Sequence, residues 1–209
     1  MHPSVIHRSL RRAAVALLAT GAALGGCQSA QESQKDWFEG GPMQPASAET
    51  LQLTVRVLAA KGQTAQAGFL LNRMLVDHPD HLGTYTEGAE VLLIEGRVDD
   101  AIDWLSRGLE RMPGQPLLLN DRGVCHLLSA DLESAARDFD AAHAADPRDA
   151  DFVSNVALAR ALQGQDEEAL RLWNMVVSPG EAASNLRVAA AARRKFASAT
   201  APGGVVIRR

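Results

Sequence analysis

A spacing of about 34 residues recurs along most of this chain of 209 residues and limits its fold more than any other feature. Pro79, Pro113 and Pro147 follow this spacing. If each proline is given position 32 of a repeating unit, the units begin at residues 48, 82, 116 and 150. Position 20 is then always alanine, and position 24 is always large and apolar. The alanines are Ala67, Ala101, Ala135 and Ala169, and the large residues are Leu71, Leu105, Phe139 and Trp173. The chain therefore contains an internal repeat.

The recurring positions are those that a pair of packed helices needs. Position 15 is glycine in three units and Ala130 in the other, which suits the left-handed residue that ends a helix. Small residues at position 20 and mostly small residues at position 8 let the two helices approach closely. Proline at position 32 stops the second helix. Position 8 holds Val55, Ala89, Gly123 and Ala157. The pattern predicts helices near 49–61, 64–77, 83–95, 98–111, 116–129, 132–145, 150–163 and 166–177.

This pattern resembles the tetratricopeptide repeat, a helix–turn–helix unit of about 34 residues. The resemblance implies an all-α superhelical solenoid of four repeats over residues 48–183, divided as 48–81, 82–115, 116–149 and 150–183. A capping helix near 181–198 is expected to cover the last unit, because an uncapped repeat exposes apolar surface. Three residues depart from the usual apolar type and predict altered local packing. They are Gly88 and Arg122 at position 7 and Arg160 at position 11.

The start of the chain has the pattern of a secretion signal. Arginines up to Arg12 precede an apolar run of twelve residues, which is too short to span a bilayer. The run ends in Leu24-Gly25-Gly26-Cys27, which resembles the lipobox of bacterial lipoproteins. The resemblance implies removal of residues 1–26, a diacylglycerol and an N-acyl chain on Cys27, and a flexible tether over 27–47. Gln28 favours the outer membrane by analogy, facing the periplasm. The alternative is an ordinary signal peptide with a chance cysteine.

Motifs that would support chemistry are few. The Asp77-His78-Pro79-Asp80-His81 run straddles a turn between units, where polar residues cap helices more often than they bind metal. Cys125 and His126 are adjacent, so on a helix they point about 100° apart and do not suit a nucleophile–base pair. With a net charge of −4 and 4% aromatic residues, nucleic-acid binding is a poor interpretation. We expect no catalytic residues, no metal, no small-molecule substrate and no cofactor besides the acyl chains.

Two regions could bind a partner. In the tetratricopeptide family, positions 2, 5, 6, 9, 12 and 13 of the first helices line a concave groove. The residues carried over are Gln52, Leu53, Arg56, Thr86, Glu87, Glu90, Leu93, Asn120, Asp121, Val124, Leu127, Asp151, Ser154, Asn155 and Leu158. Asn120 and Asn155 could pair with a peptide backbone or be solvated surface amides. The acidic groove favours a basic and apolar partner segment. Residues 184–209 hold six bases and no acid. This segment is either a solvated tail or a contact to an anionic surface or partner.

A lipobox followed by such an array resembles the tight-adherence pilus assembly lipoproteins. Leu119-Asn120-Asp121-Arg122-Gly123-Val124 and Ser178-Pro179-Gly180 carry that resemblance within the array. It implies a pilotin-like assembly factor, anchored in the outer membrane by its lipid, whose groove holds a segment of a secretin subunit. The alternative is an envelope adaptor that recruits peptidoglycan-modifying enzymes. Both functions are non-catalytic and depend on a protein partner.

Overall fold

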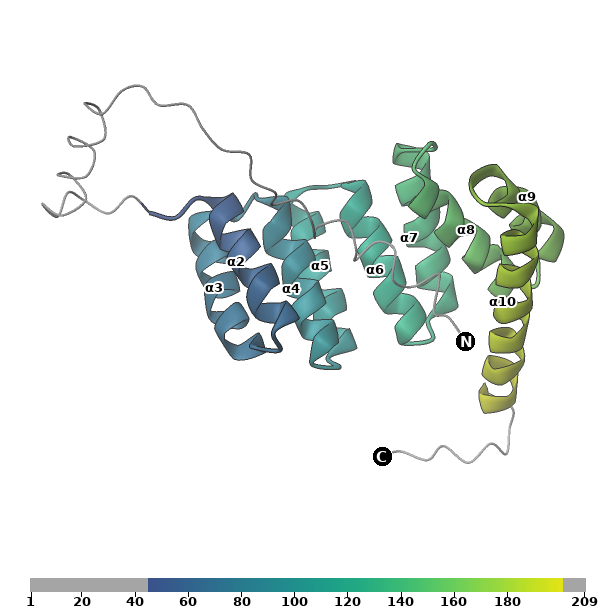
Figure 1. Ribbon diagram of the computed structural model, residues 1–209, viewed down its shortest axis with the longest axis horizontal. Coiled ribbons are helices and arrows are strands. Elements are labelled where there is room, and N and C mark those ends of the chain that lie inside the picture. The colour runs from purple at the N-terminus through teal and green to yellow at the C-terminus, as the bar shows by residue number, and fades with distance from the viewer. Residues whose placement is uncertain (1–44, 201–209) are drawn as a thin grey trace, which may run out of the picture. The chain divides into compact units, whose positions relative to one another are not determined.

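Antiparallel pairs of helices follow one another in the computed structural model, which describes residues 45–200. Figure 1 shows the pairs stacked in chain order. The pairs are α2 (Ala48–Ala60) with α3 (Thr64–Asp77), α4 (Leu82–Ile94) with α5 (Val98–Arg111), α6 (Pro116–Leu128) with α7 (Leu132–Ala145) and α8 (Ala150–Leu162) with α9 (Asp166–Val176). A longer helix, α10 (Pro179–Thr200), packs against α8 and α9. The predicted all-α superhelical solenoid of four repeats with a final helix is confirmed. None of the described helices is long and apolar enough to cross a membrane.

The core is built from the positions that recur in every unit. All four alanines at position 20 are fully buried, and the large residues at position 24 are buried beside them. Gly123 shows why position 8 must be small, since a Cβ there would lie 2.6 Å from Cε1 of Phe139 at position 24 of the same unit. The predicted register of the repeat therefore matches the packing.

The turn inside each unit uses the left-handed conformation expected at position 15. Gly62, Gly96 and Gly164 have φ of +70°, +73° and +87°. Ala130 holds the same place with φ of +64° and is the one non-glycine residue with positive φ in the described part of the chain. A side chain with a Cβ is strained in this region, so the third unit carries a local cost that the other units avoid.

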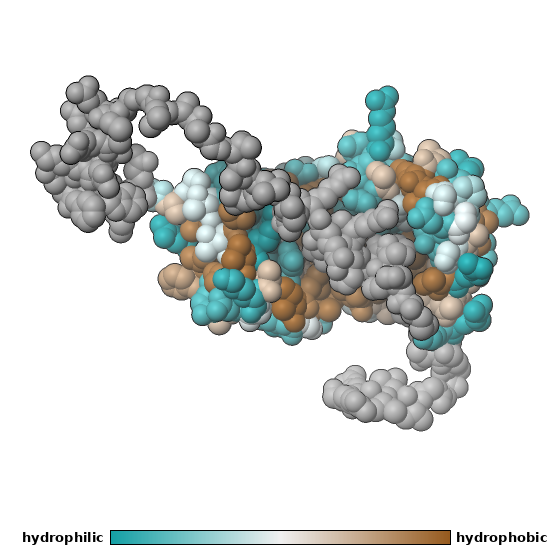
Figure 2. Space-filling model, viewed as in Figure 1, coloured by the Kyte–Doolittle hydropathy of each residue, from teal (hydrophilic) through white to brown (hydrophobic). Residues whose placement is uncertain are grey.

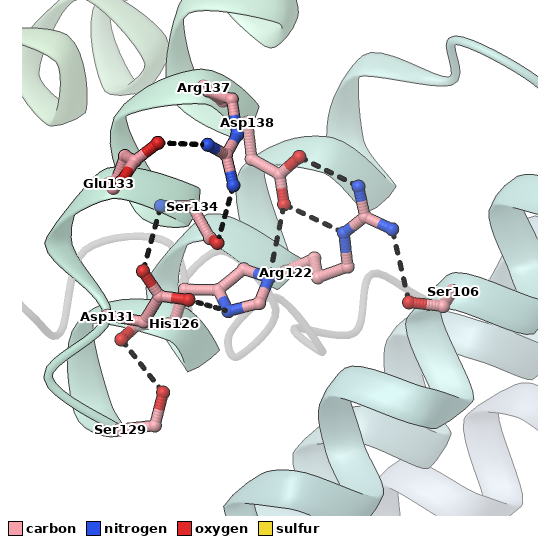
Figure 3. Close-up of polar contacts among 9 residues, drawn as sticks. All are labelled: Ser106, Arg122, His126, Ser129, Asp131, Glu133, Ser134, Arg137 and Asp138. Atoms are coloured by element: carbon pink, nitrogen blue, oxygen red, sulfur yellow. Dashed lines mark hydrogen bonds and ion pairs between the residues drawn. The ribbon is translucent and has the colours of Figure 1, made fainter.

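The departures at position 7 are compensated within their own units, sixteen residues further on. Gly88 makes room for Trp104, whose indole would collide with a Cβ there and whose Nε1 donates to the carbonyl oxygen of Thr84 at 3.1 Å. Arg122 donates from Nε and Nη2 to Asp138 at 2.7 and 2.8 Å, as Figure 3 shows. The packing is therefore altered at position 7 as the sequence predicted, and in each unit the residue at position 23 makes up for the missing apolar side chain.

The C-terminal helix differs in two respects from the expectation. It begins at Pro179, so the predicted unit boundary at residue 183 falls within α10. Arg193 was expected in a solvated or partner-binding tail, but its Nη1 donates to the carbonyl oxygen of Ala161 and to Asp166 Oδ1, both at 2.7 Å. Arg193 thus joins α10 to the end of α8 and the start of α9. The predicted signal sequence and Cys27 lie outside the described residues.

Candidate functional site

Polar side chains join the first helices of successive units across the concave face. Gln52 Nε2 on α2 donates to Glu87 Oε1 on α4 at 2.8 Å, and Arg56 forms an ion pair with the same carboxylate. Between the third and fourth units, Asn155 Nδ2 on α8 donates to Asn120 Oδ1 on α6 at 2.7 Å. Each pair joins position 5 of one unit to position 6 of the next, at a separation of 35 residues.

This pairing changes the role of two residues that were expected to contact a partner. Glu87 and Asn120 are each only 3% exposed. Their side chains hold neighbouring first helices together instead of projecting into the groove. Asn120 Oδ1 is already occupied by Asn155, so the expected hydrogen bond from Asn120 to a peptide backbone would have to compete with an internal one. At Glu87 and Asn120, the side chains on the concave face therefore serve the packing of the helices.

In the middle of the concave face, no such polar pair joins the neighbouring first helices in the described residues. The equivalent pair between the second and third units is Thr86 and Asp121, and the Asp121 carboxylate is hydrogen-bonded to Asn120 of its own helix. Burial raises the pKa of Asp121 to about 7, with smaller contributions from the charges of Glu90 and Glu87, while the hydrogen bond from Asn120 lowers it. The pKa of Glu90 is also raised, chiefly by burial and then by Glu87, with Arg56 opposing.

Arg56 is the cation that balances this cluster, and it is committed to Glu87. The hydrogen bond to Glu87 raises the pKa of Arg56 above its usual value, so the guanidinium stays charged. Within the described residues no lysine or arginine forms an ion pair with Glu90 or Asp121. The concave face therefore presents two carboxylates with elevated pKa and no bound cation.

Exposed apolar side chains stand at other groove positions of the first helices. Leu53, Ile94, Leu117 and Leu128 are 59%, 50%, 40% and 55% exposed. Figure 2 shows hydrophobic surface over α2 and along the lower edge of the array, beside hydrophilic surface. Ile94, Leu117 and Leu128 are missing from the residues chosen from the sequence, although positions 2 and 13 of the repeat would have included them.

The remaining predicted groove residues fall into two groups. Asp151 is exposed, and Thr86, Ser154 and Asn155 are half-buried. The partly buried apolar residues pack inward, against the hydrophobic clusters between the helices. They are Leu93, Val124, Leu127 and Leu158. Glu90 and Asp121, together with the exposed leucine and isoleucine side chains, are thus the candidate partner-binding residues of the concave face.

Groups with possible chemistry elsewhere are occupied or shielded. His81 Nε2 lies 2.9 Å from Gln52 Oε1, and no cluster of three or more His, Cys, Asp or Glu in the described residues could hold a metal. Burial raises the pKa of the Cys125 thiol to about 12, with a smaller contribution from the charge of Asp121. At neutral pH this thiol is protonated and therefore a poor nucleophile. His126 lies between Asp131 and Asp138, 3.8 Å from each (Figure 3).

Comparison with known proteins supports the fold. No family model matches the chain, and neither does any curated protein. Among solved structures, TTC0263, a tetratricopeptide protein of Thermus thermophilus, is similar with a TM-score of 0.58 and 20% identity over 73% of this chain and 84% of that one. A tetratricopeptide protein of Parabacteroides merdae aligns with a TM-score of 0.59 and 18% identity over 80% of this chain and 66% of that one.

YrrB, described as a tetratricopeptide protein with an unusual peptide-binding site, aligns with a TM-score of 0.55. It is 14% identical over 78% of this chain and 83% of its own. At these identities the similarity concerns the fold alone, which is a tetratricopeptide-type superhelix.

Proposed function

We propose that this protein is a non-catalytic adaptor whose concave face holds a segment of a partner protein. The observation that carries the proposal is a pair of acids, Glu90 and Asp121, that form no ion pair with lysine or arginine in the described residues and share the concave face with exposed apolar side chains. A partner segment with a lysine or arginine beside apolar residues would neutralise the acids and cover the apolar surface. The peptide-binding site named for YrrB, a protein of similar fold, supports a peptide as occupant.

We further propose, from the sequence resemblance, that the protein acts in the bacterial cell envelope. In it, acyl chains on Cys27 anchor the protein in the outer membrane, and the array faces the periplasm. The partner is a secretin subunit of a tight-adherence type of pilus system, which the protein helps to assemble as a pilotin-like factor. Two or more acyl chains make such anchoring stable, because each buried CH₂ contributes about 0.8 kcal/mol.

Isosteric neutralisation tests the groove. Glu90→Gln with Asp121→Asn removes the charges while keeping the shape of the side chains. Recovery of the secretin with the full chain from solubilised envelopes should fall by about tenfold to a hundredfold, as expected for losing about 1–3 kcal/mol of polar contact. Glu110→Gln with Glu133→Gln makes the same change of charge on second helices and should leave recovery unchanged.

Two outcomes would redirect the proposal. Equal recovery of the secretin with the groove variant and the control variant would rule out the concave face as its binding site. Specific, groove-dependent recovery of a peptidoglycan-modifying enzyme in place of the secretin would support the alternative adaptor function.

The lipid anchor needs a separate test. Cys27→Ser should leave a folded protein in the soluble periplasmic fraction, because the acyl chains are the proposed attachment. If the variant still sediments with membranes after a high-salt wash, attachment through lipid at Cys27 is wrong. The control is the unchanged chain, which should sediment under the same conditions.

A further inference from the structure

A second groove, which we term the convex groove, opens between α3 and α5 on the side of the array away from the concave face. Its volume is about 790 Å³, within the range of small-molecule and side-chain pockets. Gly88 and Leu92 of α4 form its floor, Gly68 and Phe69 of α3 form one wall, and Trp104 of α5 forms the other. The floor residues stand at positions 7 and 11 of the repeat, which are not groove positions of the concave face.

The equivalent grooves further along the array are bridged by arginine from the floor helix. Between α5 and α7, Arg122 reaches Ser106 Oγ at 3.1 Å and Asp138 on the opposite wall (Figure 3). Between α7 and α9, Arg160 reaches Asp140 at 2.7 Å and Glu168 at 3.9 Å. In the convex groove, glycine and leucine replace those arginines, so no side chain from the floor spans it.

One wall of the convex groove also carries an exposed aromatic ring. Phe69 is 72% exposed at position 22, where the other three units carry charged residues. Those residues are Asp103, Arg137 and Arg171. Opposite Phe69, the face of Trp104 is covered by Arg107, whose guanidinium carbon lies 5.7 Å from the ring centroid. Phe69 and Trp104 thus supply apolar carbon to the two walls, and Thr64, Asn72 and Asp103 add polar groups to the same lining.

Charge on the rim adds a requirement for the occupant. Arg97 is committed to Glu95 at 3.1 Å and to Asp100 at 2.6 Å, and Arg107 stacks on Trp104. Asp103 is exposed on the same rim and forms no ion pair within the described residues. The rim therefore carries an excess of acid next to an apolar space, and complementary charge on a partner would be basic.

We propose that the convex groove is a second docking site, which receives a bulky apolar side chain of another protein that is followed or preceded by lysine or arginine. The apolar side chain packs between Phe69 and Trp104 and takes up part of the groove, and the basic residue pairs with Asp103. This site lies on different residues from the concave face, and neither proposal depends on the other.

Gly68 gives a sharp test, because no heavy atom lies within 4 Å of the place where its Cβ would be. Gly68→Leu therefore places a larger apolar side chain on the wall of the groove from a position whose Cβ is unobstructed, and a thermal melt verifies that the fold is kept. Gly180→Leu is the matched control, since Gly180 also lies in a helix and its Cβ position is open. The probe is a library of random dodecapeptides displayed on phage and selected on the full chain.

Selected peptides are expected to share a bulky apolar residue beside lysine or arginine. Their affinity should fall by about tenfold or more with Gly68→Leu, as for the loss of a central anchor, and stay unchanged with Gly180→Leu. Asp103→Asn should weaken binding by about threefold and reduce its dependence on salt.

Three results would overturn the proposal. The first is a selection that enriches no peptide. The second is a set of peptides that bind the Gly68→Leu variant as tightly as the unchanged chain. Peptides whose binding is lost only in the variant with Glu90→Gln and Asp121→Asn belong to this outcome, because they bind the concave face. The third is a dimer of the unchanged chain in sedimentation that Gly68→Leu dissociates, which would assign the groove to a second copy. Absence of binding at the concave face, with the convex groove still binding its peptides, would contradict only the proposed function.

Discussion

Replacing Ala130 with glycine is expected to stabilise the array, although most substitutions do the opposite. Ala130 holds φ at +64°, the region that the glycines at the same position of the other units occupy. A left-handed residue with a Cβ costs about 1–2 kcal/mol, whereas introducing glycine costs about 0.4–1 kcal/mol through the added freedom of the unfolded chain. Because Ala130 is exposed, little packing is lost. The free energy of unfolding should therefore rise by about 0.5–1 kcal/mol.

Urea unfolding followed by circular dichroism measures this change. Because repeat arrays can unfold in parts, the comparison requires that the slope with denaturant be the same in both proteins. The thermal midpoint should rise by about 1–4 °C for a domain of this size. Gly96→Ala is the converse control at the same position of the second unit, and it should lower the urea midpoint. A lower midpoint for Ala130→Gly at an unchanged slope would refute the link between left-handed backbone strain and stability in this turn.

Three further predictions concern the core, an ion pair and pH. Ala135→Leu should lower the free energy of unfolding by about 1–3 kcal/mol, because it overpacks a fully buried helix crossing, and unchanged thermal melts would mean that the repeat register is wrong. Arg122→Ala should cost about 1–3 kcal/mol in urea unfolding because it removes both guanidinium hydrogen bonds to the buried Asp138 carboxylate, whereas the exposed Arg137→Ala should cost less than about 1 kcal/mol. The raised pKa of Asp121 means that the folded state binds more protons than the unfolded state between the ordinary aspartate pKa and about pH 7. Stability should therefore fall as pH rises through that window, and Asp121→Asn should flatten the decline of the urea midpoint between pH 5 and pH 8.

The fold could be predicted because four recurring positions have strict steric requirements. A residue at position 20 lies at a helix crossing in every unit, so alanine recurs there, and a residue at position 15 must take a left-handed turn. Ala130 shows how far such a requirement extends, since the backbone keeps φ at +64° even without glycine. These demands are local to each unit, and they therefore leave a periodic signal in the sequence.

The candidate site could be predicted only in outline. Position in the repeat placed Glu90 and Asp121 on the concave face, but it could not show that Glu87 and Asn120 are buried. Their burial depends on the distance between first helices of neighbouring units, which side chains at positions 5 and 6 bridge. A sequence signal exists in hindsight, because complementary polar residues stand 35 apart in both pairs.

The departures at position 7 also show that a single repeat position does not reveal which side chain packs beside it. Gly88 and Arg122 each look like the loss of an apolar contact when position 7 is considered alone. In the fold, position 7 lies beside position 23 of the same unit, so glycine with tryptophan and arginine with aspartate are compensated pairs. The consequence reaches beyond packing, because Arg122 also bridges the neighbouring groove to Ser106, whereas Gly88 has no side chain that could do so.

Helix α4 contributes to both proposed surfaces, and helix geometry decides whether they can act together. Glu90 and Leu92 are two residues apart, which places them about 200° apart around the helix axis. A partner on Glu90 therefore leaves Leu92 and the convex groove uncovered, and the helix backbone need not move to admit either occupant. Effects at well-separated sites without shared contacts add within about 0.3–0.5 kcal/mol. Combining Glu90→Gln with Gly68→Leu should thus reduce peptide binding at each face by the same factor as the single variant does. Calorimetric titration of each face with the other occupied would measure the coupling, and a change of more than about twofold in either affinity would show that α4 transmits binding from one face to the other.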